Sequence, residues 1–186
     1  MSIRLRQVIA TAAAVVAFAS PVAAQQRAGI MGDLMKDVSD VQGKLTALAK
    51  AMPADKYDWR PGVGVRSVGE VFMHVSADNY FMPSAVGFMP DASSGVNPKD
   101  FKTLTAFEKQ KMTPAEAAAT IDKSFVHLKQ TMSDTPDAKL DEHVKFFGQD
   151  MTVRQVWVAT ATHLHEHLGQ AIAYARMNGV TPPWSK

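Results

Sequence analysis

The stretch Thr152–Met177, TVRQVWVATATHLHEHLGQAIAYARM, decides the fold class because it carries complete signals for a long helix. Its first residue and Gln155 match a capping box, in which side chains three positions apart satisfy the first free backbone N–H groups. Asn178-Gly179 then supplies a left-handed C-terminal cap, and the prolines that follow prevent continuation. Along this helix, residues suited to the interior recur at steps of three and four positions, so they share one side, and this side is expected to pack inward. That side comprises Val156, Thr160, His163, His167, Gln170 and Tyr174.

Three further segments have the same helical periodicity: Met31–Met52, Val68–Met82 and Pro114–Met132. The second and third of these each follow a capping box of their own. Residues 87–101 are rich in Pro, Gly and Ser and predict a long surface loop, and residues 139–148 fit an extended conformation. Four amphipathic helices with little strand signal predict an all-α fold. We expect a four-helix bundle with up-and-down helices and one long crossover loop, which could cover a site.

The first 24 residues have the layout of a secretory signal peptide. Two arginines precede an apolar run from Val8 to Ala19, and small residues follow as far as Ala24. We therefore expect a single domain over residues 25–186 in a periplasmic or secreted protein. The apolar run is too short to span a bilayer, and no later segment approaches the roughly 20 apolar residues of a transmembrane helix.

Charge and cysteine content exclude several functions. Without the signal peptide the chain has 18 basic and 18 acidic residues and no basic stripe, so we expect no nucleic-acid partner. Cysteine is absent, which excludes disulfides, thiolate ligands and a cysteine nucleophile. Any metal ion must therefore be held by nitrogen and oxygen atoms.

Three of the six histidines alternate within five residues of the last helix, but they cannot act together. His163 and His167 are one turn apart on the inward side, a spacing at which two imidazoles can bind one divalent ion. His165 lies about 200° around the helix from them and must point away. The pattern is not the HExxH motif of zinc proteases, because Gly169 stands where the second histidine is required.

A third ligand has to come from another helix. His74 lies on a largely apolar side of the second helix, whereas we place His127 on the solvated side of the third helix and His143 in an irregular stretch. We therefore predict one metal site built by His74, His163 and His167, with positions left open for water or substrate.

The chain resembles the DinB-like metal-binding four-helix bundles from about Ala54 to Ser185. The loop and helix YDWRPGVGVRSVGEVFMHVSADNYF and the final helix HLHEHLGQAIAYARMNGVTPPWS carry the resemblance. It implies the same three metal ligands, namely His74, His163 and His167, and a divalent ion such as zinc or nickel. It also implies homodimers and a small-molecule substrate. The better-understood relatives are cytosolic thiol-dependent transferases and an isomerase, so an exported protein departs from them.

These observations favour a metal-dependent hydrolase or transferase whose substrate the sequence does not name. Asp78, one turn after His74, is the candidate base or ligand-orienting group, with a surface carboxylate as the alternative. We expect Glu166 to be solvated, and Gln170 either to support a ligand or to pack between helices. The competing functions are a non-catalytic periplasmic protein that binds a metal or a small ligand, and a vestigial bundle without metal.

Overall fold

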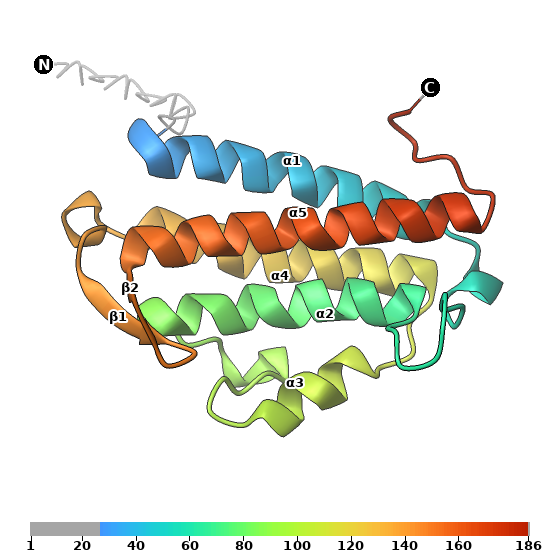
Figure 1. Cartoon of the computed structure of the whole chain (residues 1–186), viewed down its shortest axis with the longest axis horizontal. Coiled ribbons are helices and arrows are strands. Elements are labelled where there is room, and N and C mark those ends of the chain that lie inside the picture. The colour runs from blue at the N-terminus through green and yellow to red at the C-terminus, as the bar shows by residue number, and fades with distance from the viewer. Residues whose placement is uncertain (1–26, 186) are drawn as a thin grey trace, which may run out of the picture.

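The computed structural model describes residues 27–185, so the predicted signal peptide and its cleavage point lie outside the described residues. Four long helices run side by side: α1 (Gly29–Ala51), α2 (Val68–Phe81), α4 (Pro114–Asp134) and α5 (Val153–Met177) (Figure 1). The predicted all-α four-helix bundle is confirmed. Among the described residues, no helix has the length and apolarity needed to cross a membrane.

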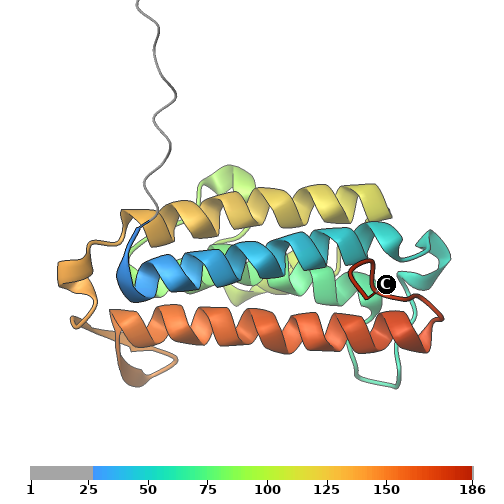
Figure 2. The same cartoon turned by 90° about the horizontal axis from the view of Figure 1, so that it is seen from above.

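The helices run in two parallel pairs. Helices α1 and α5 run in one direction, and α2 and α4 run in the other (Figures 1 and 2). Helices α1 and α2 each contact both α4 and α5 but pack little against each other, so α1 and α2 lie on opposite corners of the bundle. Two consecutive long helices, α2 and α4, can be parallel because the intervening segment carries the chain back along the bundle.

That crossover contains a helix, which the sequence pattern did not reveal. The predicted loop over residues 87–101 ends in α3 (Phe101–Glu108), which packs against α2. Asp100 caps α3 by accepting a hydrogen bond from the backbone N–H of Lys102. The helix was missed because its eight residues include only two buried side chains, too few to establish a helical period.

The extended segment predicted near residue 143 is a short hairpin. Strand β1 (His143–Phe146) pairs with β2 (Gln149–Thr152) in antiparallel register, with Phe146 opposite Gln149. A two-residue turn joins the strands, and β2 leads directly into α5. The hairpin therefore stands at the amino-terminal end of α5, on the same side of the bundle as α3 (Figure 1).

The predicted helix starts are confirmed by the three capping boxes, which open α2, α4 and α5. The main core lies between the four long helices and includes the fully buried Trp157, Phe72 and Phe125. A second apolar cluster packs the opposite side of α2 against α3 and the hairpin. Helix α2 is therefore buried on nearly all sides, and its polar residues need partners within the protein.

Candidate metal centre

The structure brings His74, His163 and His167 together between α2 and α5. One nitrogen from each ring lies within 4.8 Å of the others, and Nε2 of His74 is 3.0 Å from Nε2 of His167. The ring centroids are 4.4 to 5.3 Å apart. Because α2 and α5 are neighbours in the bundle, residues about ninety positions apart meet in the middle of the two helices.

Hydrogen bonds orient two of the three rings. Nδ1 of His74 is 2.6 Å from Oε1 of Glu108, and Nδ1 of His167 is 2.8 Å from Oε1 of Gln170. Both partners are acceptors, so each Nδ1 carries a proton, and in the neutral form that a metal ligand requires each Nε2 directs a lone pair toward the other ring. The Nε2 amide of Gln170 donates to the hydroxyl of Tyr174 at 2.9 Å, which fixes the orientation of the amide.

The donor set fits a single divalent ion. Two unprotonated nitrogens 3.0 Å apart repel each other unless a cation lies between them. Nitrogens bound at about 2.1 Å to one ion lie about 3.0–3.4 Å apart for bond angles near 90–109°. Imidazole nitrogen suits zinc and nickel, and the described residues of this chain contain no thiolate to compete.

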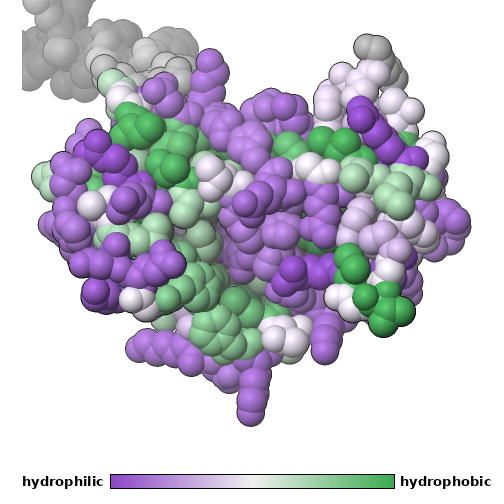
Figure 3. Space-filling view, viewed as in Figure 1, coloured by the Kyte–Doolittle hydropathy of each residue, from purple (hydrophilic) through white to green (hydrophobic). Residues whose placement is uncertain are grey.

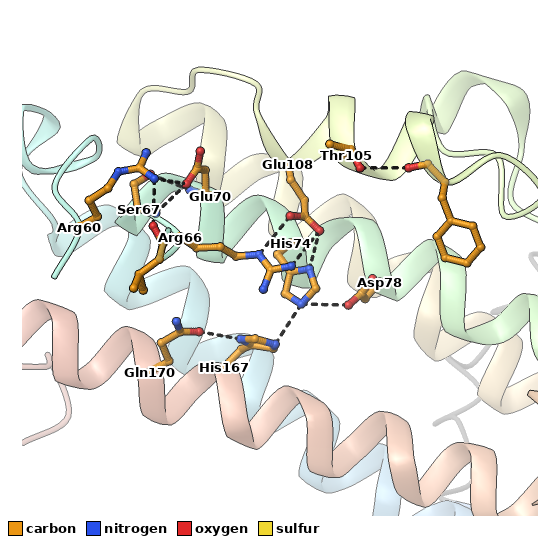
Figure 4. A network of polar contacts seen from close by, with 12 residues as sticks. Arg60, Arg66, Ser67, Glu70, His74, Asp78, Thr105, Glu108, His167 and Gln170 are labelled. Atoms are coloured by element: carbon orange, nitrogen blue, oxygen red, sulfur yellow. Dashed lines mark hydrogen bonds and ion pairs between the residues drawn. The ribbon is translucent and has the colours of Figure 1, made fainter. Parts of the chain in front are cut away.

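Asp78 contacts the histidines directly. Its Oδ2 is 2.7 Å from Nε2 of His163 and 3.2 Å from Nε2 of His74, and the residue is only 8% exposed. The alternative that Asp78 is a surface carboxylate is therefore wrong. Figure 4 shows His74 with Glu108 on one side and Asp78 and His167 on the other.

The charges around the site favour neutral imidazole on α5. Burial, reinforced by the neighbouring His74 and His163, lowers the pKa of His167 from its ordinary value of 6.5 to about 4. Burial alone would raise the pKa of Glu108, but hydrogen bonds from His74 and Arg66 bring it below its ordinary value. Arg66 donates from Nε to Oε2 of Glu108 at 3.0 Å. A neutral His167 ring and an ionised Glu108 carboxylate are compatible with metal binding, which requires unprotonated ligand nitrogens.

Sequence reasoning missed Glu108 and Arg66. Glu108 is the last residue of α3, and it reaches His74 only because the crossover folds against α2. One signal in the sequence could have indicated α3: Asp100 is a residue typical of an N-cap, and it stands one turn before Leu104 in an otherwise irregular stretch. Nothing in the spacing of Glu108 relates it to a histidine thirty-four positions upstream.

The remaining histidines do not join the site. His165 points toward α1 and lies 2.9 Å from Oδ2 of Asp37, and Glu166 is 75% exposed, as expected for both. His143 is exposed on β1, where it pairs with Asp150.

The prediction that His127 occupies a solvated side of its helix is wrong. Ser124 and Thr131 on that side are buried, and the ring of His127 packs against Tyr80 of α2. The two hydroxyls donate to backbone carbonyls of their own helix, so Ser124 and Thr131 keep their hydrogen bonds in a buried contact between α4 and α2, whereas Nε2 of His127 is buried without a partner.

A pocket of about 470 Å³ opens next to the cluster. His74, Asp78, His163 and Glu108 form its polar end, and its other walls come from α3, the β1–β2 turn and α5. His74 and His163 are therefore accessible to a small molecule from one direction.

Comparison with known proteins supports the same architecture. A DinB-like protein from Bacillus cereus ATCC 10987 is 16% identical, with a TM-score of 0.68 over 84% of this chain and 97% of that chain. YfiT from Bacillus subtilis, described as a probable metal-dependent hydrolase with an unusual four-helix bundle topology, is 13% identical. Its TM-score is 0.63 over 84% of this chain and 93% of that chain. A second DinB-like protein of Bacillus subtilis, YjoA, is 16% identical with a TM-score of 0.60, over 80% of this chain and 94% of that chain.

At these identities the structural matches show the fold alone, and no curated protein is significantly similar in sequence. The family model of the DinB superfamily matches residues 38–171, which span most of the bundle and all three clustered histidines. The chain belongs to the DinB superfamily.

Proposed function

We propose that this protein is an exported metal-dependent hydrolase that holds one divalent ion, zinc or nickel, through His74, His163 and His167. The observation that carries the proposal is the convergence of three imidazoles at the end of an open pocket. The fold shared with YfiT, a probable metal-dependent hydrolase, supports it.

The bound ion would act as a Lewis acid that polarises a substrate oxygen and lowers the pKa of water from 15.7 toward about 7. The chain's own residues supply the rest. Glu108 and Gln170 hold the rings of His74 and His167 with Nε2 facing inward. Asp78 reaches Nε2 of His163 and of His74 and lines the pocket, so its carboxylate would be placed to accept a proton from an attacking water.

The pocket favours a hydrolase over a non-catalytic binding protein. A binding or structural site is usually closed by a fourth protein ligand, whereas a catalytic site leaves a position open beside a base. Here His74 and His163 line the pocket together with Asp78, so a substrate can approach the ligands and the base at once.

Metal analysis of the protein purified without a histidine tag tests the site. We expect about one divalent ion per chain and about 2.7 kcal/mol of added stability at a free-metal concentration of 100 times Kd. The His74→Ala variant should lose both, whereas His165→Ala, which alters a histidine outside the site, should lose neither. Absence of a bound ion, or equal metal content in the His74→Ala variant, would overturn the proposal.

Activity is tested separately with a panel of carboxylic esters, amides and phosphodiesters. Hydrolysis should stop on chelation and return with zinc or nickel. A protein that binds the ion stoichiometrically but cleaves no member of the panel, with or without added metal, would instead be a metal-binding protein.

Export rests on the sequence of the first 24 residues. The intact mass of the protein recovered from the periplasm or medium should correspond to a chain that begins at Gln25. Recovery of the uncleaved chain from the cytoplasm would contradict this part of the proposal.

A further inference from the structure

The end of the pocket away from the histidines is built from aromatic rings. Phe81 of α2, Phe101 at the start of α3 and Phe147 of the β1–β2 turn come from three separate elements. The ring of Phe81 lies 5.4 Å from that of Phe101 and 5.6 Å from that of Phe147, between ring centroids. Hydrophobic surface gathers where the hairpin approaches α3 (Figure 3). Met82 and Leu104 complete an apolar chamber.

Two of these rings are exposed although they belong to a pocket. Phe101 is 58% exposed and Phe147 is 67% exposed, while Phe81 beneath them is buried. Large exposed aromatic side chains that converge on a cavity are typical of a binding site and are unusual on an inert surface.

The backbone of Phe147 is held in a conformation that its side chain disfavours. Its φ is +48°, and it is the one non-glycine residue in the described part of the chain with a positive φ. The next residue, Gly148, also has a positive φ, as in the two-residue hairpin turns that favour Asn-Gly. Asparagine or glycine would fit this position better than phenylalanine, so the ring is present at a cost in stability.

The polar groups of the pocket do not suit an anion. Asp78, Glu108 and Glu166 contribute carboxylates, and among the described residues no lysine or arginine lines it. The hydroxyls of Thr105 and Thr162 donate to backbone carbonyls, at 3.2 and 3.0 Å, so they offer the pocket acceptor lone pairs. The lining therefore disfavours an anionic ligand and suits one that can donate hydrogen bonds.

We propose that this pocket binds an uncharged substrate through an aromatic group, which is held by Phe81, Phe101 and Phe147 while its polar group faces the histidines. This inference rests on the proposed function, because it assigns the substrate class of that site. Phe147 sets the specificity: it closes the aromatic end of the pocket from the tip of the hairpin, and the strain at this residue is maintained for that contact. The pocket volume of about 470 Å³ accommodates a bicyclic aromatic compound.

Calorimetric titration with two matched probes tests the inference on the full-length mature protein, metal-loaded and chelator-treated. The probes are 1-naphthaleneacetamide, which is neutral, and 1-naphthaleneacetate, which is anionic; octanamide is the non-aromatic control. In both preparations the neutral probe should bind more tightly than octanamide. In the chelated protein it should bind about tenfold more tightly than the anion.

The variants Phe147→Gly and Phe147→Asn remove the ring and suit the turn, so the fold is retained. Both should raise the Kd of the neutral probe by about two- to tenfold, as expected for the loss of one aromatic contact. The matched control is Val126→Ala, on an equally exposed residue of α4, which should bind like the parent protein.

Unchanged Kd values in both Phe147 variants, or equal affinity for octanamide and the neutral probe, would overturn the inference. A change in sedimentation of the Phe147 variants with unaltered probe binding would also overturn it, and would identify the rings as an interface between chains. If the protein takes up no divalent ion even when metal is supplied, but still binds the aromatic probe, this inference stands and the proposed hydrolase is contradicted. The reverse result, metal-dependent turnover without aromatic preference, would contradict this inference alone.

Discussion

Oε1 of Glu108 lies 2.6 Å from Nδ1 of His74, so a helix in the crossover fixes the ring of a residue on the neighbouring bundle helix. The carboxylate is itself held by Arg66. Partners of this kind set the tautomer and raise the basicity of a metal-binding imidazole. The crossover is thus part of the candidate metal centre as well as a cover for it.

Replacing Glu108 should weaken metal binding. The Glu108→Ala variant removes the acceptor for the N–H of His74, and we expect a loss of about 10- to 100-fold in zinc affinity, measured by competition with a chromogenic chelator. Glu108→Gln keeps an acceptor oxygen and should lose less. Glu166→Gln is the control, because that carboxylate is 75% exposed and 3.8 Å from His163. Equal losses in the Glu108 and Glu166 variants would mean that the bond to His74 has no special role.

Asp78 should be required for turnover more than for metal binding. The Asp78→Asn variant keeps the shape of the side chain but cannot accept a proton, so hydrolysis should fall by about 10²- to 10⁴-fold. Metal content, measured by mass spectrometry of the purified protein, should remain near that of the parent. If the variant loses its metal, Asp78 is a fourth ligand and the site is closed.

Gln170 should act through His167. Its carbonyl oxygen accepts from Nδ1 at 2.8 Å, and its amide is held by Tyr174 at 2.9 Å. Gln170→Leu should weaken zinc binding by about 10- to 100-fold. Tyr174→Phe should cause a smaller loss, because the amide remains but is free to rotate. Zinc titration of both variants measures the two losses of affinity. A larger loss in Tyr174→Phe than in Gln170→Leu would contradict the prediction.

Acid should destabilise the metal-free fold. The folded chain keeps His167 neutral down to about pH 4, whereas the unfolded chain takes up a proton below its ordinary pKa of 6.5. The unfolded state therefore binds more protons between pH 6.5 and 4, and the free energy of unfolding falls as the pH is lowered through this range.

Urea unfolding of chelated protein at pH 7, 6 and 5 measures this dependence. The His167→Gln variant should have a shallower dependence on pH. The free energy of unfolding of this variant should still depend on pH to some extent, because burial also lowers the pKa of His127. An equal slope in parent and variant would show that His167 titrates normally in the folded chain.

The sequence predicted the parts of the fold that local chemistry controls. Capping boxes opened α2, α4 and α5 where expected, because a cap depends on side chains only three residues apart. The spacing of His163 and His167 determined that they share a side of α5 and that His165 does not. Homodimer formation and the identity of the metal stay predictions, which sedimentation and elemental analysis can measure.

The polar surroundings of the histidines depended on tertiary structure. Asp78 faces the histidines and not solvent because α2 is buried on both sides. The sequence of α2 does not reveal that burial. Similarly, the polar residues near His127 resembled a solvated surface, because buried hydroxyls that bond to their own helix look like exposed ones in sequence.

The sequence by itself determined the four long helices and the two-histidine spacing on α5, since helix periods and caps are properties of neighbouring residues. Only the tertiary structure decided that Glu108 supports His74 and that Phe147 lines the pocket. Those contacts join segments far apart in the chain, and they follow from the path of the crossover and the hairpin, which is set by packing against α2.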